Sequence, residues 1–189
     1  MKYAITSLLL TFFYASTVAQ EAFSNNTMAA LEKVIQDYPN RFNNIQGDVI
    51  IRNPQTTEYQ SKVQIAGSSS CTVTRYSSSR NDVYSWACII LKTEDFSAAK
   101  NKFDEIFNQI KNSIIKLHGE KPYILNGQYE NPNDEKKFTT IIFELLPAVG
   151  EMKKIKVDLS LQYEVTEWKI SLSVYDGEKS QNETSISTE

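Results

Sequence analysis

The sequence predicts an α+β fold in which two helices pack on antiparallel sheet. Two segments repeat apolar residues every three or four positions, which is typical of amphipathic helices. Several other runs alternate apolar and polar residues and are separated by turn residues, which is typical of half-buried strands. The expected element order is α-ββββ-α-ββββ, and it suggests a tandem duplication with a spacing of about 70 to 75 residues.

The first nineteen residues differ from the rest of the chain. Lys2 is followed by a mostly apolar run at residues 8–14, and Ala19 ends a small-x-Ala site. This pattern predicts a signal peptide that is cleaved after Ala19, with export to the periplasm or beyond the cell. The apolar run is shorter than the about 20 residues that span a bilayer, so no integral membrane segment is expected. The formal net charge of the whole chain is −3, which argues against nucleic acid as a partner.

Residues 20–94 form the first helix-and-strand half. A helical pattern begins at Asn25, and Pro39 is expected to break it, leaving a short second turn that ends at Gly47. Asn25 and Asn182 fit the N-glycosylation pattern. Four strands are expected in this half, at residues 48–52, 58–65, 70–76 and 83–91.

Cys71 and Cys88 are the only two cysteines. In an oxidising compartment they are expected to form a disulfide, and two reduced, buried thiols are the alternative. If the turn between their strands is centred between Ser79 and Arg80, the two cysteines face each other directly. A turn centred one residue later would leave them diagonal on the same face.

Residues 95–176 form the second half. Its apolar helical stripe runs from Phe96 to Leu117, with Asp95 as N-cap and Gly119 as the stop. Strands are expected at residues 121–125, 137–146, 154–165 and 168–175, with a polar, mobile hairpin loop at 126–135. Residues 177–189 are expected to be a disordered tail.

The last two strands are expected to form a hairpin whose turn is centred on Thr166 and Glu167. This register opposes Val165 with Trp168 and Tyr163 with Ile170, so that apolar side chains meet on one face. The other face is polar and is expected to contact water.

The element order resembles the tandem helix-plus-sheet build of secreted β-lactamase inhibitor proteins and of TATA-binding-protein-like folds. The resemblance lies in the order of the elements alone, and it implies a binding function more than a catalytic one.

The chain offers few residues for catalysis or metal binding. Its one histidine, His118, is expected at a helix end and cannot supply a multi-histidine metal site, so we expect no metal and no cofactor. Nucleotide-binding and standard hydrolase motifs are absent from the sequence. Glu144 is a candidate catalytic acid if it is buried, and an ordinary outward-facing residue if it is not. Asp158 and Glu164 share a face with lysines, and ion pairing explains them.

Aromatic side chains that are expected to be exposed are the remaining signal. A Tyr-rich and Ser-rich set is typical of protein-binding loops. The candidate binding residues are Arg75, which would oppose Tyr84, together with Tyr76, Tyr84, Tyr123 and Tyr129. Packing over sheet edges is the alternative for Tyr76 and Tyr84, and simple exposure to water is the alternative for Tyr129.

Two functional hypotheses follow. The first is a secreted or periplasmic, non-catalytic binding protein for an unidentified protein or small molecule. The second is an extracellular enzyme or accessory protein that acts on a polymer through paired carboxylates.

Overall fold

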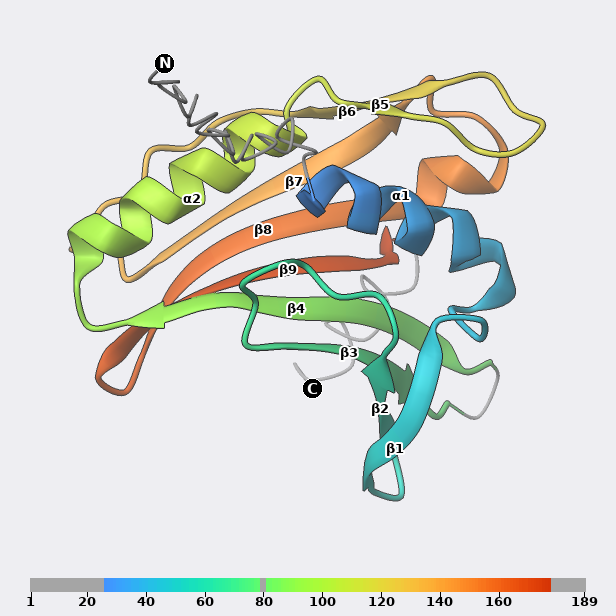
Figure 1. The fold of residues 1–189 in the computed structure, drawn as a ribbon, viewed down its shortest axis with the longest axis horizontal. Helices are drawn as coiled ribbons and strands as arrows, with labels where there is room; N and C mark the ends of the chain where they lie inside the picture. The colour runs from blue at the N-terminus through green and yellow to red at the C-terminus, as the bar shows by residue number, and fades with distance from the viewer. Residues whose placement is uncertain (1–25, 79–80, 178–189) are drawn as a thin grey trace, which may run out of the picture.

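The computed structural model describes residues 26–78 and 81–177, and in them a single nine-stranded antiparallel sheet carries two helices on one face (Figure 1). The α+β class is therefore confirmed. The helices are α1 (Asn26–Asp37) and α2 (Phe96–Ile110), with short 3₁₀ helices η1 (Tyr38–Asn40) and η2 (Gly150–Lys154). The strands are β1 (Gln46–Arg52), β2 (Thr56–Ser61), β3 (Ser70–Tyr76), β4 (Val83–Thr93), β5 (Ile114–Ile115), β6 (Tyr123–Gly127), β7 (Phe138–Leu146), β8 (Ile155–Glu164) and β9 (Glu167–Asp176).

The strand order is β1-β2-β3-β4-β9-β8-β7-β6-β5. Each half is a meander of sequential neighbours, and the pairing of β4 with β9 joins the halves into one sheet. The expected order α-ββββ-α-ββββ and the duplication are not confirmed, because α2 is followed by five strands. The additional strand is the two-residue β5.

Helix α1 ends at the break that Pro39 predicts. The 3₁₀ helix η1 begins at Tyr38 and carries Pro39 in its first turn. Its buried face includes Leu31, Val34 and Ile35, all with no exposed surface. Gly47 does not end a second turn as expected: it lies inside β1. The second predicted strand is also shorter than expected, since β2 ends at Ser61.

Helix α2 begins as predicted but ends early. The Asp95 side chain caps it by accepting a hydrogen bond from the Ser97 amide at 2.8 Å. The expected continuation to Leu117 is wrong, because Asn112 is left-handed with φ of 59° and its amide donates to the Leu125 carbonyl at 2.9 Å. Pairing with β6 thus replaces the helical hydrogen bonds.

The residues after α2 change accordingly. Ile114 is in β5, and His118 is exposed in a later turn with Gly119, so neither His118 nor Gly119 lies at a helix end. The polar loop is also displaced by two residues from its predicted position, because Asn126 and Gly127 belong to β6 and β7 begins only at Phe138.

The register predicted for the hairpin of β3 and β4, which carries both cysteines, is confirmed. Cys71 opposes Cys88, Arg75 opposes Tyr84, and the two cysteines form a disulfide in the core. This pairing agrees with the expected disulfide and not with the alternative of two reduced thiols. The hairpin centre, residues 79–80, lies outside the described residues.

The register predicted for the last hairpin is wrong by two residues. Tyr163 opposes Trp168, and Glu164 opposes Glu167, so that Val165 and Thr166 form the turn. Val165 is 95% exposed and left-handed with φ of 57°. A shift of two keeps every side chain on its own face, so matching apolar residues could not tell the two registers apart. The tight turn decided the register.

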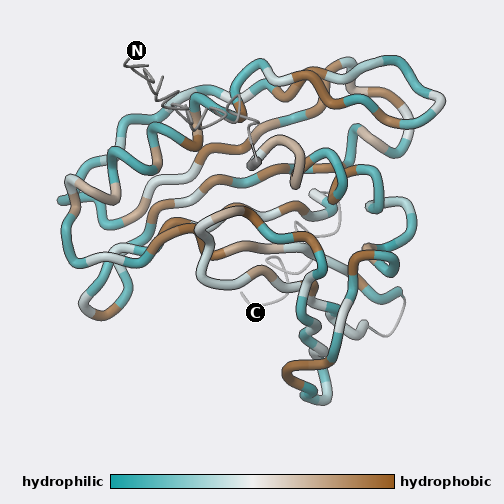
Figure 2. The backbone as a smooth tube through the Cα atoms, in the orientation of Figure 1, coloured by the Kyte–Doolittle hydropathy of each residue, from teal (hydrophilic) through white to brown (hydrophobic). Residues whose placement is uncertain are grey.

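The core lies between the sheet and the helices. Figure 2 shows apolar and polar residues alternating along the central strands, as expected for a sheet with one buried face. Among the described helices none is long and apolar enough to cross a membrane. The predicted signal peptide, both glycosylation sites and the tail from residue 178 lie outside the described residues.

Candidate functional site

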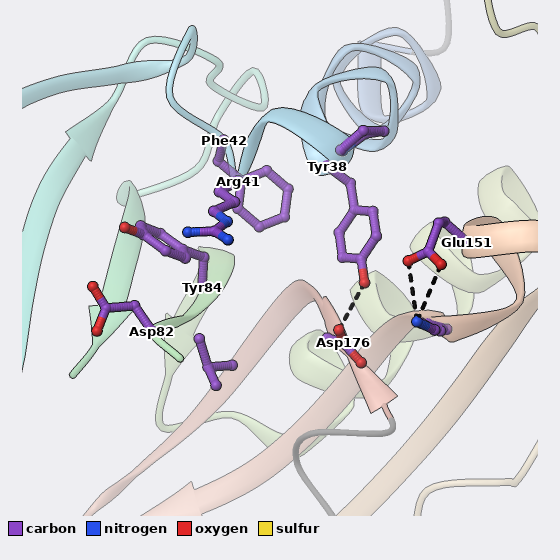
Figure 3. A pocket seen from close by; sticks show the side chains of 10 residues that line it. Tyr38, Arg41, Phe42, Asp82, Tyr84, Glu151 and Asp176 are labelled. Carbon is purple, nitrogen blue, oxygen red and sulfur yellow. Dashed lines mark hydrogen bonds and ion pairs between the residues drawn. The ribbon is translucent and has the colours of Figure 1, made fainter. Parts of the chain in front are cut away.

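A pocket of about 270 Å³ opens at one end of the sheet (Figure 3). Four separate parts of the chain meet there: the turn after α1, the start of β4, the end of β9 and η2. The lining residues are Tyr38, Pro39, Arg41, Phe42, Asp82, Val83, Tyr84, Glu151, Lys154 and Asp176.

Buried Asp37 organises the wall that follows α1. Its carboxylate accepts hydrogen bonds from the Asn40 amide group at 3.0 Å, from Asn44 through its backbone at 3.0 Å and its side chain at 2.5 Å, and from the Ile45 amide at 3.3 Å. Two of these bonds satisfy backbone amides of the segment that follows η1, where no α-helix continues. Asp37 therefore holds the segment that carries the pocket residues.

Two left-handed residues in this segment separate its side chains. Arg41 has φ of 56° and Phe42 has φ of 58°. Phe42 is fully buried, whereas Arg41 is exposed. Figure 3 shows Arg41 extending from this turn toward Tyr84.

Aromatic rings form the apolar part of the pocket. The rings of Tyr38 and Phe42 meet edge-to-face, with 6.0 Å between their centroids. The Tyr38 hydroxyl donates a hydrogen bond to Oδ2 of Asp176 at 2.9 Å, which fixes that ring against the end of β9. Tyr84 of β4 supplies the third ring.

The charged groups of the pocket differ in how they are engaged. Lys154 donates to both carboxylate oxygens of Glu151, at 3.2 and 3.1 Å. Asp82 lies 3.9 Å from Nε of Arg75. The guanidinium of Arg41 makes no hydrogen bond or ion pair with any other residue that the structure describes.

The structure brings three of the five predicted binding residues to this end of the sheet. Tyr84 lines the pocket, and Arg75 opposes it on β3. Arg75 donates to the Thr57 hydroxyl at 3.3 Å, while its buried Nε lacks a hydrogen-bond partner within the described residues. Tyr76 is the next residue on β3 and is 38% exposed, as predicted, on the opposite face of the strand.

The other two predicted residues lie elsewhere. Tyr123 is 5% exposed and its hydroxyl binds Glu120, so the expectation that Tyr123 is exposed is wrong. Its ring occupies the core face of β6. Tyr129 is 39% exposed, as expected, but it packs on Phe107 of α2 at a centroid distance of 4.9 Å.

The hydroxyl of Tyr129 donates to Oδ1 of Asp104 at 2.6 Å. Burial, followed by this hydrogen bond, raises the pKa of Tyr129. These contacts attach the loop to the helix.

Two of the three acids on the open sheet face form ion pairs with lysine, and the third does not. Here, the open face is the side of the sheet that neither described helix covers. Glu144 is exposed and pairs with Lys156, in agreement with the outward-facing alternative. Glu164 pairs with Lys169, as expected. Asp158 does not follow the expectation of ion pairing with lysine.

Asp158 is a partly buried acid whose environment the sequence analysis missed. It accepts a hydrogen bond from the Thr140 hydroxyl at 2.7 Å, and burial raises the pKa of the Asp158 carboxyl. Its direct cross-strand neighbours are Ile142 and Ser173. Burial also raises the pKa of Tyr175, with a smaller contribution from the charge of Asp158. Strand alternation identified the face of Asp158 but not its depth.

The sequence signal for the pocket was limited to Tyr84 and the break at Pro39. The contributions of Asp82, η2 and Asp176 depend on strand ends that are far apart in sequence. Across the described residues, no group of three or more histidine, cysteine or acidic side chains could hold a metal ion. The pocket presents aromatic rings and the guanidinium of Arg41 among its lining groups. Comparisons with protein-family models, with curated proteins and with solved structures found no match to this chain.

Proposed function

We propose that this chain is an exported, non-catalytic binding protein whose pocket takes a flat apolar group that carries an anionic substituent. The observation that carries the proposal is the combination of three aromatic rings with the unengaged guanidinium of Arg41. The disulfide between Cys71 and Cys88 supports export, because such bonds persist in oxidising compartments.

The rings support the apolar part of the ligand. Binding pockets are mostly apolar and contain a few convergent polar groups that set the orientation of the ligand. Tyr38 is held by Asp176 and Phe42 by its burial, so these two rings need little rearrangement on binding. A flat group between Tyr38 and Tyr84, with buried Phe42 supporting Tyr38 from behind, would meet a largely preformed surface.

The guanidinium of Arg41 supports the anionic part. Lys154 is already engaged by Glu151, so Arg41 is the cation with free hydrogen-bonding capacity at the pocket. A guanidinium binds carboxylate or phosphate with two parallel hydrogen bonds. The ligand class that best fits is therefore an aromatic or similarly flat acid, either free or at the end of a larger molecule.

The alternative is an enzyme or accessory protein that acts on an extracellular polymer through paired carboxylates. Its first candidate, Glu144, is exposed, pairs with Lys156 and does not line the pocket. Asp158 is a partly buried acid with a raised pKa, but it also lies away from the pocket lining. We therefore favour binding.

The two halves also remain a proposed tandem duplication. In each half a helix precedes a meander of antiparallel strands, and the two meanders extend in opposite directions from the β4–β9 pair. This arrangement places the pocket near the end of the junction between the halves, where Tyr84 and Asp176 are contributed by β4 and β9.

The test uses the chain beginning at Gln20 and two matched small-molecule probes. Phenylacetate carries a ring and an anion, and phenethylamine carries a ring and a cation. We expect phenylacetate to shift the NMR signals of the Arg41 side chain and the Tyr84 ring. Phenethylamine is expected to bind at least about tenfold more weakly.

Three variants locate the binding. Arg41→Gln is expected to weaken phenylacetate binding by at least about tenfold, because the charged hydrogen bonds are lost. Tyr84→Ala is expected to weaken the binding of both probes. Lys121→Gln, at an exposed lysine outside the pocket, is the control and should change the binding of neither probe. Absence of any shift at Arg41 and Tyr84, or equal binding of the two probes, would contradict the proposed ligand class.

A further inference from the structure

We propose that β1 pairs antiparallel with β1 of a second copy of this chain, so that the two nine-stranded sheets join edge to edge in a symmetric dimer. This inference is independent of the pocket and of the function proposed for it. It rests on the position of β1, on its exposed side chains and on the order of its charges.

Strand β1 is an outermost strand of the sheet. Its only strand partner among the described residues is β2, so the backbone groups along its other edge have no strand beside them. The β1–β2 hairpin projects from the body of the molecule, which leaves room for a second sheet (Figure 1). An unpaired edge of this kind is a template for another strand.

The side chains of β1 are unusually apolar for an exposed edge. Val49, Ile50 and Ile51 are consecutive and are 44%, 53% and 48% exposed. Figure 2 shows this apolar stretch on the projecting hairpin. Consecutive exposed aliphatic residues indicate a surface that is covered in the assembled protein.

The charges that flank these residues identify a second copy as the partner. The sequence Asp48-Val49-Ile50-Ile51-Arg52 has an acid at one end, a base at the other and three aliphatic residues between them. In an antiparallel self-pair centred on Ile50, Asp48 of each copy faces Arg52 of the other. Val49 then faces Ile51, and Ile50 faces its own equivalent on the two-fold axis. Registers shifted by one or two residues lose both charge pairs.

The geometry also favours a closed dimer over an open chain of copies. The opposite edge of the sheet, β5, has only two residues and offers little backbone for pairing. A β1-to-β1 contact uses the same surface on both copies and therefore closes on itself. The two register irregularities within β1 add twist to this edge, and the interface is confined to a short strand. We therefore expect a weak dimer that forms as the protein concentration rises.

The first experiment is sedimentation equilibrium of the chain beginning at Gln20, over about 10 µM to 1 mM, with charge-reversal variants. The unmodified chain is expected to show a concentration-dependent monomer–dimer equilibrium. Asp48→Arg or Arg52→Asp alone gives positions 48 and 52 the same charge, so that both cross-copy pairs become repulsive. Each of these variants is expected to weaken association by at least about tenfold. The double variant restores both charge pairs and is expected to restore the dimer.

A control variant separates this effect from net charge. Lys121→Glu changes the net charge as Arg52→Asp does, but at an exposed position outside β1, and it should leave association unchanged. All of these positions are exposed, so thermal unfolding of the variants should remain close to that of the unmodified chain.

The second experiment tests the two-fold axis directly. Ile50→Cys adds one thiol to a chain whose two cysteines are already paired, and a short bismaleimide should cross-link it to a dimer. Val165→Cys, at a more exposed position on the β8–β9 turn, should stay at the background level. A chain that is monomeric over the whole range, or a dimer that resists both single reversals, would overturn the proposal.

Discussion

Asp158 shows how much the depth of a single side chain matters on a face that the sequence marks as polar. It lies on β8 between Ile142 and Ser173, and its one hydrogen bond comes from the Thr140 hydroxyl. Burial penalises the charged carboxylate more than this bond stabilises it, so the pKa of Asp158 lies above its ordinary value of 3.8. A charged Asp158 therefore opposes folding.

We expect Asp158→Asn to raise the melting temperature at pH 7. The folded state binds the Asp158 proton more tightly than the unfolded chain does. The stabilising contribution of Asp158 is therefore fully present below pH 3.8 and is lost as pH rises through the raised folded pKa. Asparagine removes this loss and can still accept the bond from Thr140.

The measurement is thermal unfolding of both proteins between pH 3 and pH 8. The advantage of the variant should be largest at neutral pH and should shrink as the pH falls toward 3.8. Asp134→Asn, at an exposed acid, is the control and should show little advantage. A variant that is less stable than the unmodified chain at pH 7 would show that the charge of Asp158 is compensated.

At the scale of elements, the two hairpins differ in what determined their registers. For β3 and β4, the cysteine pair and the turn indicated the same register, and Cys71 does face Cys88. For β8 and β9, two registers placed the same side chains on the same faces. Hydrophobic alternation has a period of two, so it cannot detect a shift of two residues.

Helix α2 shows the same limit for helical periodicity. The apolar stripe predicted its core face well, and Phe103, Ile106 and Ile110 are buried. Beyond Ile110 the helical spacing fails: Ile114, which it placed on the core face, is 57% exposed. Ile115 and Leu117, two residues apart, face the core instead from an extended segment. A competing strand partner, β6, ended the helix.

Phe103→Ala tests the packing of α2 on the sheet. The Phe103 ring is fully buried, so its loss is expected to reduce the free energy of unfolding by about 3–5 kcal/mol. Urea denaturation followed by circular dichroism measures this change. Lys102→Ala, on the exposed side of the same helix, removes only a surface ion pair with Glu105 and should cost below about 1 kcal/mol. A loss below about 1 kcal/mol at Phe103 would refute the packing of this face.

At the scale of the whole molecule, the β4–β9 pair makes the two halves share one sheet and one core. Trp86 opposes Val174, and Cys88 opposes Leu172, with all four side chains buried in the same cluster. The disulfide is therefore attached to the strand that joins the halves.

Reduction of the disulfide should destabilise the protein without abolishing its fold. The bond links residues separated by 17 positions, and a loop of this size is worth roughly 3 kcal/mol on the chain-entropy model. We expect the free energy of unfolding, measured with urea, to be lower by this amount in the reduced protein. Unfolding should remain a single transition. Thiol counting on the oxidised protein should find no free thiol. Two reactive thiols in the folded, oxidised chain would contradict the pairing.

The sequence by itself determined the α+β class, the helix starts, the break at Pro39 and the pairing of Cys71 with Cys88. These features depend on neighbours in sequence, where caps, turn residues and apolar spacing act directly. Only the tertiary structure decided the end of α2, the register of β8 and β9, the burial of Asp158 and the assembly of the pocket. Each of these depends on the segment that lies beside a residue in space: β6 beside the end of α2, Ile142 beside Asp158, and Asp176 beside Tyr38. Local patterns specify which face of an element is apolar, but contacts between distant elements decide how deeply each side chain is buried.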